Sequence, residues 1–231
     1  MKLKFRNLAP VLASSVLLAA ATASYGMDYS VSGQVWEGGT TSSVPAAGSS
    51  VYSTPATAVF TVTNTSPTSL FSFNSNGSAN YTLSSFLTSG GDSLSFLSGS
   101  GAAGDSINND LFQFTGTTTL ADNTKYTFEH DDGLLLYLGG NLVVNQGGPT
   151  SAVTTTLCVG TGLSGCSFTI SNPTGPLSFT LDYAEVSGAP AVLETSLPLT
   201  GPAPTPEPSS LILLGSGVLG MAGLVRRRLM A

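Results

Sequence analysis

Short apolar runs, each interrupted by polar residues, fill the middle of the chain and limit what it can fold into. Thr, Ser, Gly, Asn and Pro dominate there, with β-branched and aromatic residues spaced among them. This composition is typical of short strands joined by many turns. Long amphipathic helical patterns are not visible. The sequence therefore predicts an all-β fold, an antiparallel β-sandwich, with an N-terminal signal helix and a C-terminal hydrophobic helix.

Alternation with a period of two residues predicts the clearest strands. Residues 126–130 alternate and run into the turn signal Asp131-Asp132-Gly133, and residues 134–138 and 142–144 follow around Gly139-Gly140. We expect these three strands to form a β-meander. Residues 177–183 predict a central strand with one face in the core and one in solvent. Further short strands are expected at 59–62, 70–73, 81–87, 94–97 and 111–114, and a loop or bulged edge at 38–57.

Basic residues are confined to the two ends of the chain. Lys125 is the only one between them, and residues 24–206 carry twelve acidic side chains, a formal net charge of about −11. Such a surface repels phosphate backbones, which argues against nucleic acid as a partner.

The two cysteines, Cys158 and Cys166, lie close together in a Gly-rich stretch. In an exported protein, such a pair is most simply a disulfide that closes a small loop. A metal site would need more ligands than two thiols, and no histidine or further cysteine lies nearby.

The N-terminus has the three parts of a signal peptide. Residues 1–6 form a basic n-region, residues 8–21 are an apolar stretch broken once by Pro10, and Ala21-Thr22-Ala23 has the small-x-small form that a signal peptidase accepts. We predict a signal peptide over residues 1–23, cleaved after Ala23. An uncleaved N-terminal anchor is the alternative, for which the apolar stretch is short.

The C-terminus also has three parts in order: Pro206-Glu207-Pro208, the apolar run 211–225, and Arg226-Arg227-Arg228. This arrangement resembles the PEP-CTERM sorting signal of Gram-negative bacteria that make exopolysaccharide. The resemblance implies a linker at 199–205, a sorting signal at 206–231, and an inner-membrane exosortase that cleaves near the Pro-Glu-Pro. Fifteen residues make about 22 Å of helix against a hydrocarbon core of roughly 30 Å, so the run is a transient membrane handle.

The arginines place the preceding domain on the far side of the inner membrane, at the cell surface or in the extracellular matrix. An unprocessed tail anchor is one alternative. A second is a sortase substrate, because Leu197-Pro198-Leu199-Thr200-Gly201 fits the Leu-Pro-x-Thr-Gly pentapeptide. Nine residues lie between that glycine and the apolar run, whereas sortase substrates usually place the two almost together.

The middle domain, residues 24–198, carries a second resemblance. Residues 126–133, Leu136-Tyr137-Leu138-Gly139-Gly140 and 179–185 are similar to the protective-antigen-type β-sandwich of bacterial toxins, glycosidases and yeast flocculins. The resemblance implies carbohydrate binding, and in the flocculin branch the paired aspartates hold Ca²⁺ through a cis peptide bond. Asp131 and Asp132 are therefore the candidate metal ligands, and Ca²⁺ the candidate cofactor.

One departure and one simpler reading accompany that site. The flocculin site takes further oxygens from a late asparagine loop, but this chain has no asparagine after Asn172, which leaves Asn145 as a candidate. The simpler reading of Asp131-Asp132-Gly133 is a hairpin turn. We expect His130 to be a strand residue at the sheet rim, and Glu185 and Glu194 to be solvated edge residues. Candidate sugar-stacking platforms are Trp36 and Tyr137, with Tyr52 and Tyr81.

Catalysis is disfavoured because the sequence has no Gly-x-Ser-x-Gly, no second histidine and no phosphate-cradling glycine loop. A non-catalytic carbohydrate-binding or adhesive protein, associated with exopolysaccharide, is the leading hypothesis. The alternatives are a purely structural matrix protein and an ice-binding protein. Ice binding would need flat threonine ladders, and residues 117–119 and 154–156 do not repeat at a regular period.

Overall fold

The computed structural model describes residues 29–40, 42–64, 71–79, 81–186 and 188–200. The expected signal peptide, the Pro-Glu-Pro, the apolar run and the arginine cluster lie outside these ranges, so both terminal helices do too. Within the described ranges, no helix has the length and hydropathy needed to cross a membrane.

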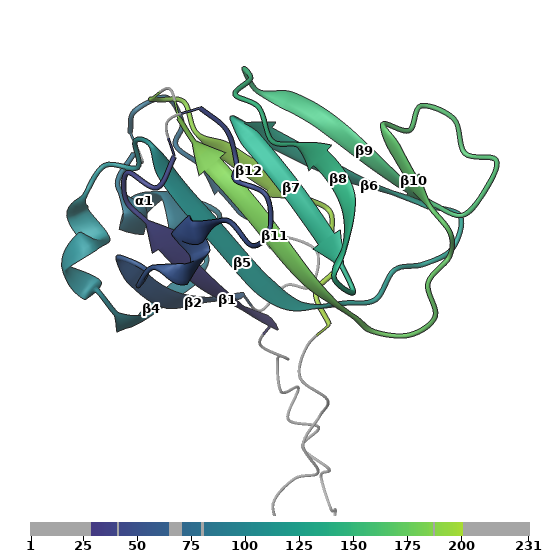
Figure 1. Ribbon diagram of the computed structural model, residues 1–231, viewed down its shortest axis with the longest axis horizontal. Helices are drawn as coiled ribbons and strands as arrows, with labels where there is room; N and C mark the ends of the chain where they lie inside the picture. Colours follow the sequence, from purple (N-terminus) through teal and green to yellow (C-terminus); the bar gives the residue numbers. More distant parts are fainter. Residues whose placement is uncertain (1–28, 41, 65–70, 80, 187, 201–231) are drawn as a thin grey trace, which may run out of the picture.

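Two β-sheets form the domain (Figure 1), which confirms the predicted all-β sandwich. All neighbouring strands are antiparallel except β9 and β10, which run parallel. The larger sheet has the order β4 (Ser93–Ser98), β2 (Ala58–Asn64), β1 (Tyr29–Trp36), β5 (Asp110–Thr118), β11 (Leu177–Glu185), β7 (Gly133–Leu138) and β8 (Asn141–Gln146). The smaller sheet has the order β10 (Phe168–Ile170), β9 (Val153–Val159), β6 (Thr124–Asp131), β12 (Val192–Thr195) and β3 (Ser72–Asn74).

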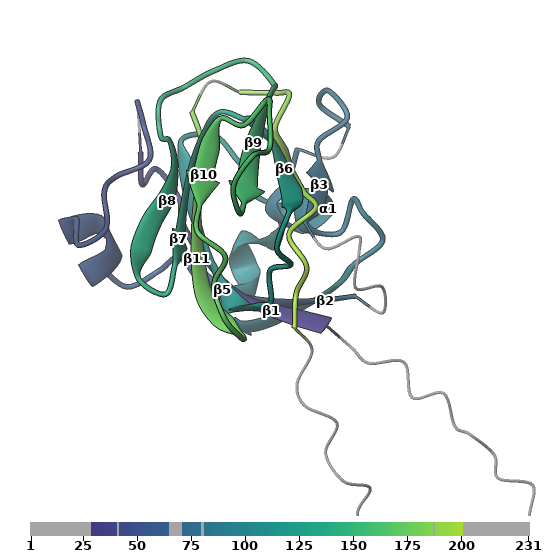
Figure 2. The ribbon, with the colours of Figure 1, turned by 90° about the vertical axis from the view of Figure 1, so that its right-hand side faces the viewer.

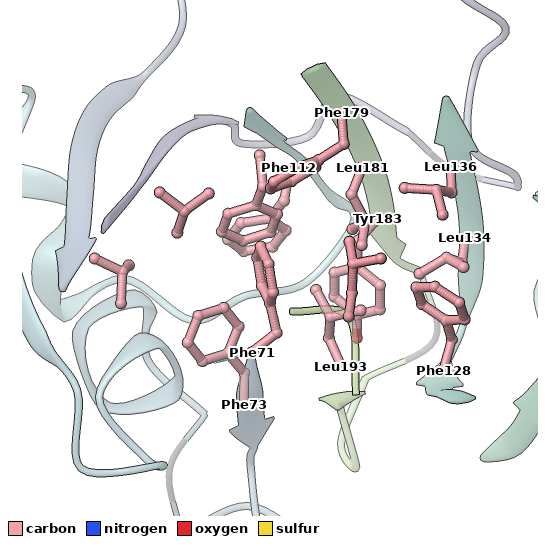
Figure 3. Packing of buried hydrophobic residues seen from close by; sticks show 14 of the residues in the cluster. Phe71, Phe73, Phe112, Phe128, Leu134, Leu136, Phe179, Leu181, Tyr183 and Leu193 are labelled. Carbon is pink, nitrogen blue, oxygen red and sulfur yellow. The ribbon is translucent and has the colours of Figure 1, made fainter. Parts of the chain in front are cut away.

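The core lies between the sheets and is built largely from aromatic rings (Figure 3). The ring of Phe71 packs edge-on against Phe114 and Phe179, with centroid distances of 5.1 and 6.1 Å. Each fully buried phenylalanine contributes about 1.5 to 3 kcal/mol relative to an exposed one. Along a strand, buried side chains occur at every second residue. This period of two residues is the pattern from which strands were predicted.

The outer face of the larger sheet is covered in part, which differs from expectation. The segment 38–57, expected as a loop or bulged edge, contains the 3-10 helix η1 (Ser50–Ser53) and a second buried cluster. That cluster consists of Trp36, Val44, Leu111, Leu135 and Ala184. The face of β11 that was expected to meet solvent is therefore partly buried.

The predicted β-meander over residues 126–144 is wrong in its first half. Strand β6 belongs to the smaller sheet and β7 to the larger one, so Asp131-Asp132-Gly133 carries the chain from one sheet to the other. The second half is confirmed, because β7 and β8 pair as a hairpin. Gly139 and Gly140 both have positive φ, 55° and 81°, as a tight two-residue hairpin turn requires.

Residues 81–87, expected as a strand, contain the short helix α1 (Leu83–Leu87) instead. A capping box explains the difference: Ser85 N donates to Thr82 Oγ1 and Thr82 N donates to Ser85 Oγ. Leu83, Phe86 and Leu87 then point to the core at helical spacing. A second 3-10 helix, η2 (Ser100–Gly104), follows β4.

The predicted disulfide is confirmed, since Cys158 and Cys166 are bonded with an S–S distance of 2.00 Å. It joins β9 to the loop that precedes β10. Strands β1, β9 and β10 were not anticipated from the sequence.

The packed domain extends two residues beyond the expected boundary at residue 198. Leu199 forms a β-bridge with Thr118 and is buried, and Thr200 N donates to Thr117 O at 2.8 Å. Leu197 is buried as well. The described part of the sortase-like pentapeptide is therefore built into the sheet, which argues against its use as an accessible cleavage site.

Candidate functional site

The aspartate pair lies where the chain leaves β6 for the larger sheet. Asp131 is the last residue of β6, Asp132 follows it, and the peptide bond between them is cis, as the family resemblance implied. A pocket of about 370 Å³ opens beside them. Its lining consists of Asp131, Asp132, Pro149, Thr150, Ser151, Gly188, Ala189 and Pro190.

Main-chain amides hold both carboxylates in place. The Asp132 side chain, 2% exposed, accepts from Thr150 N at 3.1 Å through Oδ1 and from Val186 N at 2.8 Å through Oδ2. The Asp131 carboxylate accepts a backbone hydrogen bond from Ala152. Each carboxylate oxygen has two lone pairs, so one amide bond leaves room for a further ligand.

Two buried side chains hold the main-chain carbonyls of the same pair. The hydroxyl of Tyr183 donates to Asp131 O, and His130 Nδ1 lies 2.6 Å from Asp132 O. His130 Nε2 lies 3.0 Å from Thr155 Oγ1. The expectation of a rim position for His130 is wrong: the ring is fully buried, and burial lowers its pKa.

Glu185, at the end of β11, corrects a second expectation. It was expected at a solvated edge, but it is fully buried, with Oε2 3.2 Å from the Tyr183 hydroxyl and Oε1 3.2 Å from the Tyr81 hydroxyl. Burial, followed by the charge of Asp132, raises the pKa of Glu185 to about 8. Glu194 is half-buried in β12, where it accepts from Asn74 Nδ2 at 3.0 Å.

No lysine or arginine of the described residues lies beside the pair. Burial and then the charge of Asp132 raise the pKa of Asp131, and burial above all raises that of nearby Asp110 to about 7. Lys125, the only basic residue in the described ranges apart from the histidine, lies at the other end of β6 and donates to Ser164 O. The site therefore favours a bound proton or a bound cation.

The other three candidate ligand residues do not line this pocket. Asn145 and Tyr137 line a pocket of about 290 Å³ on the outer face of the larger sheet. Trp36 is 4% exposed, packs edge-on against Tyr52 at 5.5 Å and donates its indole N–H to Thr54 O. Because its ring is covered, the expectation that Trp36 offers a sugar-stacking platform is wrong.

Sequence reasoning also missed residues that support the pair. Tyr183 was assigned to the core without a polar role, and Thr150 and Val186 were not noticed because they act through their main-chain amides. The available signal was the spacing of Tyr183 and Glu185, which share the inward face of β11 as residues i and i+2.

The chain is similar to several solved structures. One is the "PA14 sugar-binding domain from RTX adhesin", with 23% identity, a TM-score of 0.49, and coverage of 76% of this chain and 92% of that chain. Another is the "PA14 domain of MpAFP Antifreeze protein", with 18% identity, a TM-score of 0.49, and coverage of 75% and 83%. A beta-glucosidase from Kluyveromyces marxianus matches over 39% of this chain and 11% of that one, with 15% identity and a TM-score of 0.24.

Among curated proteins, none matches the sequence. A family model described as the PEP-CTERM protein-sorting motif matches residues 204–228, which confirms the reading of the tail. Residues 204–228 therefore carry a sorting motif that indicates an exported protein, held transiently at the membrane and processed by an exosortase.

Proposed function

We infer that this is a non-catalytic surface or matrix protein whose domain binds carbohydrate through Ca²⁺ held by Asp131 and Asp132. One observation carries the proposal: two adjacent, buried carboxylates border one pocket, and the single lysine of the described residues lies at the other end of β6. A signal peptidase would cleave the signal peptide, and an exosortase would release the protein from the membrane. The domain would then lie among the exopolysaccharides of a Gram-negative cell.

The donor set fits calcium better than a softer metal. Ca²⁺ takes six to eight oxygen ligands, and two carboxylates with the hydroxyls and carbonyls of the pocket rim are all oxygen donors. Within the described residues, no three acidic, histidine or cysteine side chains gather to hold a metal by themselves. The remaining ligands would then come from main-chain carbonyls, water and vicinal hydroxyls of a sugar.

The charges of the buried carboxylates also favour Ca²⁺ as the ligand of this site. Burying several carboxylates together costs free energy, because each loses hydration and repels its neighbours. Glu185 and Asp110 share this end of the sandwich, and their raised pKa values of about 8 and 7 reflect that cost. A divalent cation at Asp131 and Asp132 would offset the repulsion, and bound calcium would supply a positive centre for sugar hydroxyls.

A purely structural matrix protein is the second candidate, and one observation favours it. Both oxygens of Asp132 already accept main-chain amides, from Thr150 and Val186, which is what a residue that only fixes the crossover would do. In that case the aspartates order the loops and bind no ligand.

Isothermal titration calorimetry of Ca²⁺ into chelator-treated residues 24–206 separates the two candidates. We expect binding with a Kd below about 100 μM, within the range of Ca²⁺ sites in proteins. The double variant Asp131→Asn/Asp132→Asn should lose it. The control Asp122→Asn changes an exposed turn aspartate outside the pocket and should bind as the wild type does.

Glycan binding with and without calcium completes the test. Binding that needs calcium and disappears in the double variant supports the proposal. If the wild-type domain gives no heat with Ca²⁺, the calcium site is refuted and the structural role becomes the better account.

A further inference from the structure

The outer face of the larger sheet holds a second hollow, separate from the aspartate pocket. It has a volume of about 260 Å³ and shares no lining residue with the aspartate pocket. Its lining consists of Ala47, Gly48, Tyr52, Gln113, Tyr137, Gly140, Thr180 and Asp182. We call it the sheet-face pocket. Drug-sized ligands occupy pockets of roughly 300–1,000 Å³, so this pocket suits a single ring.

Three neighbouring strands set the floor of the sheet-face pocket. Gln113 of β5 is paired with Asp182 of β11, and Thr180 of β11 is paired with Tyr137 of β7. Directly paired residues point to the same face of a sheet, so an amide, a carboxylate, a hydroxyl and a phenol are presented together. The floor lies on β5, β11 and β7, which are adjacent strands inside the larger sheet and not at its edges.

Asp182 has more acceptor capacity than its neighbours use. It is 1% exposed, and its Oδ1 accepts from Gln113 Nε2 at 2.9 Å. The Tyr52 hydroxyl lies beside the same carboxylate, but it also lies 3.1 Å from Pro45 O. A phenol has one hydrogen, so it can serve only one of these acceptors. A buried carboxylate at the floor of a pocket with a shared donor favours a ligand that brings hydroxyl groups.

The walls of the pocket are held from behind. The ring of Tyr52 packs edge-on against buried Trp36 with an interplanar angle of 86°, and the Tyr137 hydroxyl accepts from Ala47 N at 3.1 Å. Two braced aromatic rings beside hydrogen-bonding groups are the combination that sugars require, because a sugar ring has apolar C–H faces and a polar rim.

A row of hydroxyl side chains leads across the sheet to this pocket. The partners in register are Ser95 with Thr61, Thr61 with Ser32, Ser32 with Thr115, and Thr115 with Thr180. Thr180 is in turn paired with Tyr137. Five strand spacings of about 4.8 Å give the row a length of about 24 Å. The row contains no charged residue, which suits a neutral chain of hydroxyl-bearing units.

We propose that the sheet-face pocket is a second carbohydrate site, which binds one neutral sugar unit without calcium while the hydroxyl row receives the neighbouring units of the same chain. The sheet-face pocket does not include Asp131 or Asp132, so this proposal can be tested separately from the proposed calcium site.

The test is affinity electrophoresis and calorimetry of residues 24–206 in EDTA, with neutral glucose-, galactose- and mannose-based oligosaccharides of six units as probes. We expect the wild type to bind one of these classes. Asp182→Asn should weaken binding about tenfold or more, because it replaces a charged acceptor at the pocket floor. Ala47→Phe, an exposed position on the pocket rim, should block the pocket without touching the core.

Two control variants show which of the two pockets is responsible for binding. Asp122→Asn lies outside both pockets and should bind as the wild type does, and Asp131→Asn/Asp132→Asn should retain the EDTA-resistant binding. The proposal is overturned if the wild type binds none of the probes in EDTA, or if Asp182→Asn and Ala47→Phe both bind unchanged. Binding that appears only with calcium also overturns it, and assigns recognition to the aspartate pair alone.

Discussion

The substitution Glu185→Gln tests the electrostatic account of the aspartate end most directly. Glu185 is fully buried between the hydroxyls of Tyr81 and Tyr183. Glutamine has nearly the same shape, and its amide can accept from the Tyr81 hydroxyl and donate to the Tyr183 oxygen, but it carries no charge. The variant should therefore remove the cost of ionising this carboxyl and leave the packing intact.

The direction of the effect follows from the pKa. The pKa of Glu185 is raised from 4.5 to about 8, so between these values the folded protein holds a proton that the unfolded chain has released. This stabilisation is fully present below pH 4.5 and is lost as pH rises to about 8. At 1.36 kcal/mol for each pKa unit, the full loss would be about 4 to 5 kcal/mol, which is an upper limit. Solvent penetration and local relaxation reduce it, and we expect about 2 kcal/mol.

Urea unfolding in EDTA at pH 5 and pH 8.5 measures this difference. Wild type and Glu185→Gln should agree closely at pH 5, and the variant should be more stable at pH 8.5 by about 2 kcal/mol. Asp110 and Asp182, with pKa values raised to about 7 and 6, titrate in the same direction in both proteins and cancel in the comparison. Asp122→Asn, an exposed turn position outside both pockets, is the control and should change neither value.

A variant that is no more stable than the wild type at pH 8.5 would refute the reasoning. It would mean that Glu185 is ionised without cost, and therefore that the buried acids do not repel one another strongly enough to favour a cation.

Three further outcomes test other parts of the structure. Replacing Cys158 and Cys166 together by serine should cost about 2 to 3 kcal/mol in urea unfolding by the loop-entropy estimate, and an unchanged midpoint would contradict it. Gly33→Ala should destabilise by about 1 to 3 kcal/mol or more, because its Cβ would lie 2.1 Å from the ring of Phe60, whereas Gly101→Ala meets nothing within 4 Å and serves as its control. The single histidine should titrate below pH 6.5 in an NMR titration because burial lowers its pKa, and a midpoint at or above 6.5 would show that the interactions with Asp132 outweigh burial.

Local pattern was enough to predict the fold class and several of its elements. Strand β11 followed from strict alternation, the β7–β8 hairpin from Gly139-Gly140, and the disulfide from the short spacing of the cysteines. Each of these depends on residues that are close in sequence. A hairpin turn was predicted at Asp131-Asp132-Gly133 from the same kind of local pattern, and this prediction was wrong. Nothing in the local sequence distinguishes a hairpin turn from a crossover between two sheets.

The candidate sites show the same limit. Asp131 and Asp132 could be named from the family resemblance, but burial of Glu185 depends on loops and strands that come from distant parts of the chain. The hydroxyl row could not be predicted from the sequence for a similar reason. A search for threonines at a regular period examines one strand after another, whereas Ser32, Thr61 and Ser95 line up only across paired strands.

The positions of the two described chain ends indicate where the aspartate pocket lies relative to the sorting motif. Strand β11 begins at Leu177, which pairs with Thr118, and Thr118 in turn bridges to Leu199 near the end of the described chain. The strand ends eight residues later at Glu185, beside the aspartates, and at about 3.3 Å per residue the two points are some 26 Å apart. Figures 1 and 2 show both described ends at the same end of the sandwich. Because the sorting motif follows at residues 204–228, a domain held by that tail would present the aspartate pocket at the end of the sandwich farthest from its attachment.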